Sequence, residues 1–267
     1  MKSTAFFHVG FHKTGTTYIQ DLLRQNAENL PNRYHFFVQG DAECNALRRS
    51  FRHRGVGAFA ESRNLEEVEK TLLELDEIAG ERAIVLSDET IFGYLPGKYA
   101  PFNIYHDLGE RIEFIRKVLS NRDPVFFIYT RELTDWLLSV YKEAVKGHRE
   151  KMEFESYVKR MKIGDGLVPL CQKLVAEHGE TTITFRDMDV DNDEKLGVGT
   201  ALLRWIGITD EELNAIHSVN RQNESLPDGI LKAILAINRT SLPKRAVTTM
   251  VNNMSLVVTK QSKKKSK

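Results

Sequence analysis

Short apolar runs alternate with longer amphipathic segments along most of this chain. The short runs have the length of strands and are rich in Val, Ile and Phe, whereas the longer segments repeat their apolar positions at helical spacing. The pattern predicts strands at residues 5–11, 34–38, 83–86, 125–130 and 181–185. Strands that alternate with helices favour a parallel sheet covered by helices on both faces.

The helices expected between these strands each carry one apolar stripe. After the first strand, Ile19, Leu22, Leu23 and Leu30 fall on one face, as a helix that packs on a sheet requires. We therefore predict an α/β fold of three layers, with a central parallel sheet flanked by helices and extra helices in the C-terminal third.

The length and composition favour one domain. The chain has 267 residues with 41% hydrophobic content, enough for one large core and too little for two. We assign residues 1–259 to this domain. Residues 260–267 are mostly lysine and are expected to form a disordered tail.

Charge and cysteine content narrow the class of partner. The 38 Lys and Arg residues nearly cancel the 37 Asp and Glu residues, which gives no overall support for nucleic-acid or membrane-surface binding. A small molecule or a glycan is the expected partner; no pattern indicates an oligomeric state. Cys44 and Cys171 are too few and too far apart for a disulfide framework or a zinc site. With no apolar run near the roughly 20 residues of a membrane span, and a first strand that leaves no room for a signal peptide, we expect a soluble cytoplasmic protein.

The most informative segment is residues 6–20, where a buried strand, a glycine-bearing turn and a helix start follow one another. Backbone N–H groups of such a turn converge at the positive end of the helix dipole, where a phosphate or sulfate group is favoured. Gly10 and Gly15 have the spacing of a Walker A loop, but Thr16 stands where that motif has lysine, and the lysine is Lys13. An ordinary ATP or GTP site is therefore disfavoured, and a chance glycine turn is the alternative.

This loop resembles the 5′-phosphosulfate-binding loop of sulfotransferases that use 3′-phosphoadenosine 5′-phosphosulfate. Their loop runs Lys-x-Gly-Thr-Thr, and this sequence has Lys13, Thr14, Gly15, Thr16 and Thr17. The resemblance implies that the three-layer fold is P-loop-like and that these residues bind the donor, with His12 as a further contact. His8 lies inside the predicted strand and is expected to be a core or supporting residue.

A second candidate anion site follows the fourth predicted strand. Arg131 ends that strand, at the edge where open α/β sheets bind ligands. Ser139 follows eight positions later, about 12 Å along a helix, so that both groups can reach one phosphate. A surface arginine and an exposed serine are the structural alternative. The spacing also resembles the 3′-phosphate element of the same sulfotransferases, and the resemblance extends from His8 to about Gly147, more loosely beyond.

A carboxylate at the end of the third predicted strand is the candidate base. Ser87, Asp88 and Glu89 leave that strand on the same edge of the sheet as the glycine turn. The resemblance to glycan-modifying sulfotransferases, in which a glutamate acts as base, favours Glu89 over Asp88. Capping of a helix by Ser87 or Asp88 is the remaining alternative.

Two further segments carry weaker indications. The resemblance implies that Arg221 and Asn223 contact the donor nucleotide, whereas the same segment also has the pattern of a capped helix start. A cluster of arginines is either a solvated helix face or a basic lip that recruits an anionic acceptor or closes over the donor. The cluster comprises Arg48, Arg49, Arg52 and Arg54.

The resemblance thus implies a sulfotransferase that moves a sulfuryl group from 3′-phosphoadenosine 5′-phosphosulfate to a hydroxyl or amine, with Lys13 and Glu89 as catalytic residues. A carbohydrate or glycolipid acceptor is expected, and no metal. Two alternatives stay open: a P-loop kinase with an unusual lysine position, and a nucleotide-binding protein without catalytic activity.

Overall fold

The computed structural model of the chain describes residues 3–51, 65–93, 95, 105, 107–161, 163–220 and 226–265, with residues 257–265 described by their backbone only. Its centre is a sheet of parallel strands in the order β2-β3-β1-β4-β5. The strands are β1 (Thr4–His8), β2 (Tyr34–Val38), β3 (Ala83–Ser87), β4 (Asp123–Thr130) and β5 (Ile183–Asp187).

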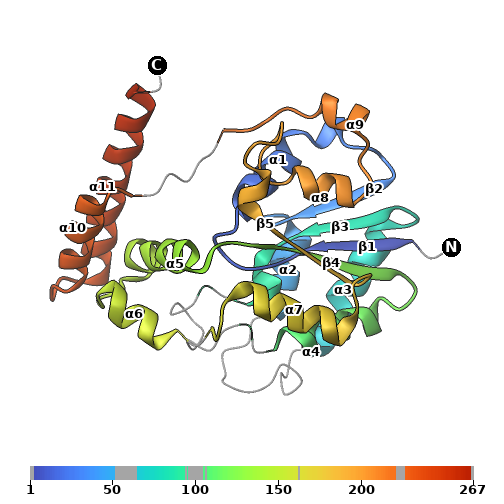
Figure 1. Ribbon diagram of the computed structural model, residues 1–267, viewed down its shortest axis with the longest axis horizontal. Helices are drawn as coiled ribbons and strands as arrows, with labels where there is room; N and C mark the ends of the chain where they lie inside the picture. Colours follow the sequence, from blue (N-terminus) through green and yellow to red (C-terminus); the bar gives the residue numbers. More distant parts are fainter. Residues whose placement is uncertain are drawn as a thin grey trace.

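Helices cover both faces of the sheet, which makes the three layers predicted from the sequence (Figure 1). One face is covered by α1 (Thr16–Gln25), α8 (Thr200–Trp205) and α9 (Asp210–Ala215). The other face is covered by α2 (Ala42–Ser50), α3 (Leu65–Ala79), α4 (Leu108–Val118) and α7 (Leu167–His178). Short 3₁₀ turns lie at η1 (Ala27–Asn29), η3 (Glu89–Phe92) and η4 (Met188–Asp191).

A third group of helices lies beyond the carboxyl ends of the strands, opposite the N-terminus (Figure 1). It consists of α5 (Leu133–His148), α6 (Phe154–Arg160), α10 (Asp228–Asn238) and α11 (Lys244–Lys265). These are in part the extra C-terminal helices that the pattern predicts. The helix α11 runs to Lys265 and so enters the segment expected to be a disordered tail.

The sheet separates two hydrophobic cores, and side chains of β1 enter them alternately because successive residues of a strand point to opposite faces of the sheet. Phe7 packs in the core under α3 and α4, whereas Phe6 contacts the core under α1 and α8. The strand ends at His8 and not at residue 11, because the chain leaves the sheet there to form the turn that precedes α1.

The strand order brings the loops after three neighbouring strands together at the carboxyl edge of the sheet. From β1 the chain continues to α1 on one face, whereas from its neighbour β4 it continues through α5 to α7 on the other. Open α/β sheets bind ligands at the carboxyl edge where the order of strands reverses in this way. The loops after β1, β3 and β4 meet at this edge, since β1 pairs with both neighbours.

The helix α5 is held by the C-terminal helices. Asn238 on α10 donates hydrogen bonds to the carbonyl oxygens of Val145 and Glu150, at 2.8 and 3.0 Å. Arg149, at the end of α5, donates to the carbonyl oxygens of Asn238, Thr240 and Leu242 in return. No helix among the described residues is long and apolar enough to span a membrane.

Candidate functional site

The turn between β1 and α1, residues 9–15, is held in a conformation that only a few residue types tolerate. Lys13 and Gly15 both have positive φ angles, of 69° and 85°. A side chain at position 15 would place its Cβ 2.8 Å from Cγ1 of Val198, so glycine is required both by the backbone and by its neighbour. Thr14 closes the turn by donating its hydroxyl to the carbonyl oxygen of Phe11 at 2.6 Å.

The start of α1 faces the turn. Gly15 caps the helix with no side-chain hydrogen bond to its first N–H groups, and Thr16 is buried while Thr17 is exposed. The first N–H groups of a helix have no partner inside it and carry the positive end of the dipole. An anion beside Gly15 and Thr17 therefore meets a favourable field.

The turn is anchored from two sides. The indole Nε1 of Trp136 on α5 donates to the carbonyl oxygen of His12 at 2.7 Å. The backbone N–H of His12 donates to the hydroxyl of Tyr105 at 3.3 Å, and the Tyr105 ring packs on Phe11. Since Trp136 lies in the first turn of α5, the turn after β1 and the start of α5 are direct neighbours.

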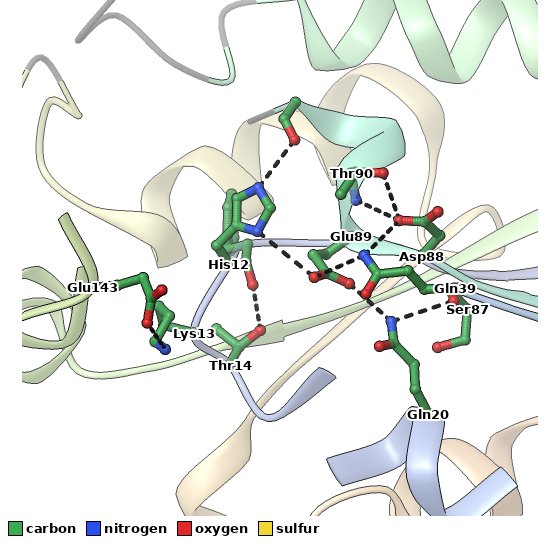
Figure 2. Close-up of polar contacts among 12 residues, drawn as sticks. His12, Lys13, Thr14, Gln20, Gln39, Ser87, Asp88, Glu89, Thr90 and Glu143 are labelled. Atoms are coloured by element: carbon green, nitrogen blue, oxygen red, sulfur yellow. Dashed lines mark hydrogen bonds and ion pairs between the residues drawn. The ribbon is translucent and has the colours of Figure 1, made fainter. Parts of the chain in front are cut away.

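Lys13 reaches across to α5. Its ammonium contacts a carboxylate oxygen of Glu143 at 3.3 Å, and both side chains are about one-third exposed or less (Figure 2). Burial alone would raise the pKa of Glu143, but the nearby Lys13 charge brings it below its ordinary value. Ser139 lies one helical turn before Glu143, so Ser139 is on the same face of α5 as the residue that Lys13 contacts.

Arg131 lies directly after β4, where the sequence places a strand end. Its Nε is buried and has no hydrogen-bond partner in the described structure. Buried polar groups are nearly always paired. The Arg131 Nε is therefore an unused hydrogen-bond donor at the carboxyl edge of the sheet, where an anionic ligand could accept from it.

Glu89 sits across the turn from Lys13, in the 3₁₀ turn that follows β3. Its side chain is only 11% exposed and is reached by donors from two elements (Figure 2). Gln20 on α1 donates to Oε2 at 2.9 Å, and Gln39 after β2 donates to Oε1 at 3.2 Å. The Nδ1 of His12 lies 3.8 Å from Oε1.

The ring orientation of His12 is set by the chain beyond Glu89. Its Nε2 lies 3.0 Å from the carbonyl oxygen of Gly93, which can only accept, so Nε2 carries a proton. Nδ1 therefore faces the Glu89 carboxylate. His12 thus joins the turn after β1 to the segment after β3.

Asp88 has a structural environment. One of its oxygens accepts from the backbone N–H of Thr90 at 2.8 Å, from the Thr90 hydroxyl at 2.6 Å and from Gln39 at 3.3 Å. Burial, and then the charge of Glu89, raise the pKa of Asp88 to about 6. Asp88 is the cap of the turn that carries Glu89, which is the capping role weighed from the sequence.

His8 is a core residue, as its place in the strand suggests. It is buried, and its Nδ1 lies 2.8 Å from the hydroxyl of Ser87, its register partner on β3. Burial lowers the pKa of His8 to about 4, so the ring is neutral near pH 7.

Several predicted residues are not part of this arrangement. Arg221 and Asn223 lie outside the described residues, as do Arg52 and Arg54. Arg48 and Arg49 lie in the last turn of α2, with Arg48 half-buried and Arg49 exposed.

Sequence reasoning missed the three side chains that hold Glu89 and Lys13 in place: Gln20, Gln39 and Glu143. Gln20 had a signal, because a polar residue at a buried position beside Ile19 is unusual on an apolar helix face. Gln39 and Glu143 become visible only when β2 is known to pair with β3 and α5 to face the turn.

Among solved structures, the chain is similar to a crystal structure of a sulfotransferase from Alicyclobacillus acidocaldarius, with a TM-score of 0.50 and 18% sequence identity over 89% of this chain and 93% of that chain. This chain has a sulfotransferase-like fold. At this identity the similarity concerns the fold. No protein-family model matches the chain, and no curated protein matches it.

Proposed function

We propose that this chain is a sulfotransferase that moves a sulfuryl group from 3′-phosphoadenosine 5′-phosphosulfate to a hydroxyl or amine of an acceptor. One observation carries the proposal. A strained glycine turn with its lysine lies between a buried carboxylate, Glu89, and a helix bearing Ser139, with the unpaired Arg131 Nε at the end of the adjacent strand. The sulfotransferase-like fold supports the same conclusion.

The 5′ end of the donor binds at the turn. Backbone N–H groups of Gly15, Thr16 and Thr17 and the hydroxyls of the two threonines donate to the phosphosulfate, helped by the dipole of α1. His12 and Thr14 complete this contact. The residues fit an anion because no side chain caps the helix start among those described.

The 3′-phosphate binds between Arg131 and Ser139. The buried Nε of Arg131 lacks an acceptor, which a phosphate oxygen provides. The Lys13 contact to Glu143 supports a single continuous site, because it places the α5 face bearing Ser139 beside the turn. Arg221 and Asn223 remain proposed donor contacts from the segment before α10.

Transfer takes place in line. The acceptor oxygen or nitrogen forms a bond to sulfur while the bond from sulfur to the bridging phosphate oxygen breaks, and the acceptor proton passes to Glu89. Lys13 leaves Glu143 and stabilises the charge that grows on the leaving phosphate. Asp88 keeps Glu89 in position as the cap of its turn, and we assign it no proton transfer.

The acceptor that we propose is a carbohydrate or glycolipid precursor. A carboxylate base and the arginines at the end of α2 favour a polar, anionic acceptor entering beside Glu89. Cys44 and Cys171 are both unpaired and buried, which suits a reducing compartment, and we propose the cytoplasm.

The first test is a calorimetric titration with 3′-phosphoadenosine 5′-phosphate without metal, set against ATP with Mg²⁺. We expect tight, metal-independent binding of the former, and sulfuryl transfer to a glycan panel that Glu89→Gln lowers by about 10²–10⁴-fold. Binding of ATP with Mg²⁺ and phosphoryl transfer would instead establish a kinase. Donor binding with no transfer and no effect of Glu89→Gln would establish a binding protein.

A further inference from the structure

Among the described residues, Gln39 is the side chain whose amide contacts both carboxylates of the site. Its Nε2 lies 3.3 Å from Oδ1 of Asp88 and 3.2 Å from Oε1 of Glu89 (Figure 2). An amide nitrogen carries two N–H groups, so it can donate to both oxygens at once. Gln39 therefore joins the cap of the turn to the carboxylate that the turn carries.

The backbone fixes Gln39 in this place independently of its side chain. Its N–H donates to the carbonyl oxygen of Ser87 at 3.0 Å, which extends the pairing of β2 with β3 by one step beyond Val38. The side chain of Gln39 consequently begins at the strand edge, beside Asp88. A change of this side chain leaves the backbone bond intact, so variants are expected to fold.

The two oxygens of Glu89 are held from different elements. Gln20 of α1 holds Oε2, while Gln39 holds Oε1 on the side that His12 faces. A carboxylate offers about four acceptor sites, so these contacts fix its orientation while leaving it able to accept a further proton. Removal of Gln39 frees one oxygen to rotate away from the turn.

The neighbouring carboxylates of Asp88 and Glu89 repel each other, and the Gln39 amide donates to both of them. Burial, and next the Glu89 charge, raise the pKa of Asp88 to about 6, while hydrogen bonds from Thr90 and Gln39 oppose the rise. Among the described residues, the other titratable groups around the pair include His8, His12, Cys44 and Tyr105, each of which is buried.

We infer that Gln39 is a positioning residue, which orients Glu89 for proton transfer by donating to it and to Asp88 together. The inference rests on the proposed role of Glu89 as the base. It assigns to the end of β2, which carries no charge and no recognised motif, a part in the reaction at the end of β3.

The test compares Gln39→Met, which keeps the shape and removes the donor, with Gln39→Glu. Gln172→Met, on the exposed face of α7, is the matched control. We expect Gln39→Met to lower kcat about 10-fold to 100-fold while the Kd for 3′-phosphoadenosine 5′-phosphate stays within about twofold. Gln39→Glu donates only when protonated, so its kcat relative to that of the unchanged protein should rise as the pH falls from 8 to 6.

A second measurement needs no activity. Carbon-13 NMR of the Asp and Glu carboxyls, with Asp88→Asn and Glu89→Gln for assignment, should place the Asp88 midpoint in Gln39→Met above that of the unchanged protein. An unmoved midpoint, or an unchanged kcat in Gln39→Met, overturns the inference. If the unchanged protein transfers no sulfuryl group, the proposed function fails and the role of Gln39 in proton transfer fails with it. A shifted Asp88 midpoint in Gln39→Met would then still show that Gln39 donates to this carboxylate pair, so the two failures are distinguishable.

Discussion

The requirement for glycine at position 15 predicts how the turn after β1 responds to one added methyl group. In Gly15→Ala the backbone keeps a φ near 85°, which costs an L-residue roughly 1–2 kcal/mol. The new Cβ also lies 2.8 Å from Val198 Cγ1, and overpacking of this kind costs typically about 1–3 kcal/mol. The total is about 2–5 kcal/mol, and at roughly 2–4 °C per kcal/mol the expected fall in Tm is about 4–20 °C.

Gly80→Ala separates the two contributions. Gly80 also has a positive φ, of 60°, but a Cβ there meets no atom within 4 Å. We expect it to lose only the backbone part, roughly 1–2 kcal/mol. Thermal and denaturant unfolding measure both variants, and calorimetry with 3′-phosphoadenosine 5′-phosphate should show weaker binding for Gly15→Ala and unchanged binding for Gly80→Ala.

Measuring Gly15→Ala in a Val198→Ala variant tests the steric contribution directly. With the valine methyls gone, the cost of Gly15→Ala should fall by roughly 1–3 kcal/mol in a double-mutant cycle. Equal costs at positions 15 and 80, with no coupling to Val198, would refute the steric part of the reasoning.

Four further outcomes are expected. The folded-state pKa of Asp88, about 6, exceeds its ordinary value of 3.8, so the protein loses stability as the pH rises through that interval. At pH 8 the Asp88→Asn variant should therefore be more stable than the unchanged protein by up to about 3 kcal/mol. Unfolding curves should show this difference closing near pH 4. In transfer assays Asp88→Asn should retain far more activity than Glu89→Gln, and equal losses would argue against Glu89 as the base. Lys13→Ala should abolish turnover, so substantial activity in that variant would refute its role. Trp136→Phe removes the donor to the His12 carbonyl and should cost about 1–3 kcal/mol of unfolding free energy; an unchanged Tm would show that the bond contributes nothing.

Much of the fold follows from local patterns. The strands and the helix stripe at Ile19, Leu22 and Leu23 depend on the spacing of neighbouring residues, and the structure confirms the parallel sheet with helices on both faces. Strand ends were less predictable: β5 begins at Ile183, because the N–H groups of Thr182 and Ile183 still bond to the carbonyl of Gly179.

The surroundings of the site depend on contacts that no local pattern encodes. Gln39 and Glu89 meet only because β2 and β3 are neighbours, and Lys13 meets Glu143 across 130 positions. The turn, Arg131 and Glu89 were visible from the sequence, since each follows a strand. The donors that orient them were not, and the roles of all these residues remain predictions.

The central claim is that one donor molecule spans the turn after β1 and the Arg131 site, and calorimetry with two ligands tests it most directly. We expect Arg131→Gln to weaken binding of 3′-phosphoadenosine 5′-phosphate at least tenfold and to leave binding of adenosine 5′-phosphate unchanged, whereas Lys13→Ala weakens both. Unchanged affinity of Arg131→Gln for the bisphosphate, or an equal loss for the two ligands, would contradict the account.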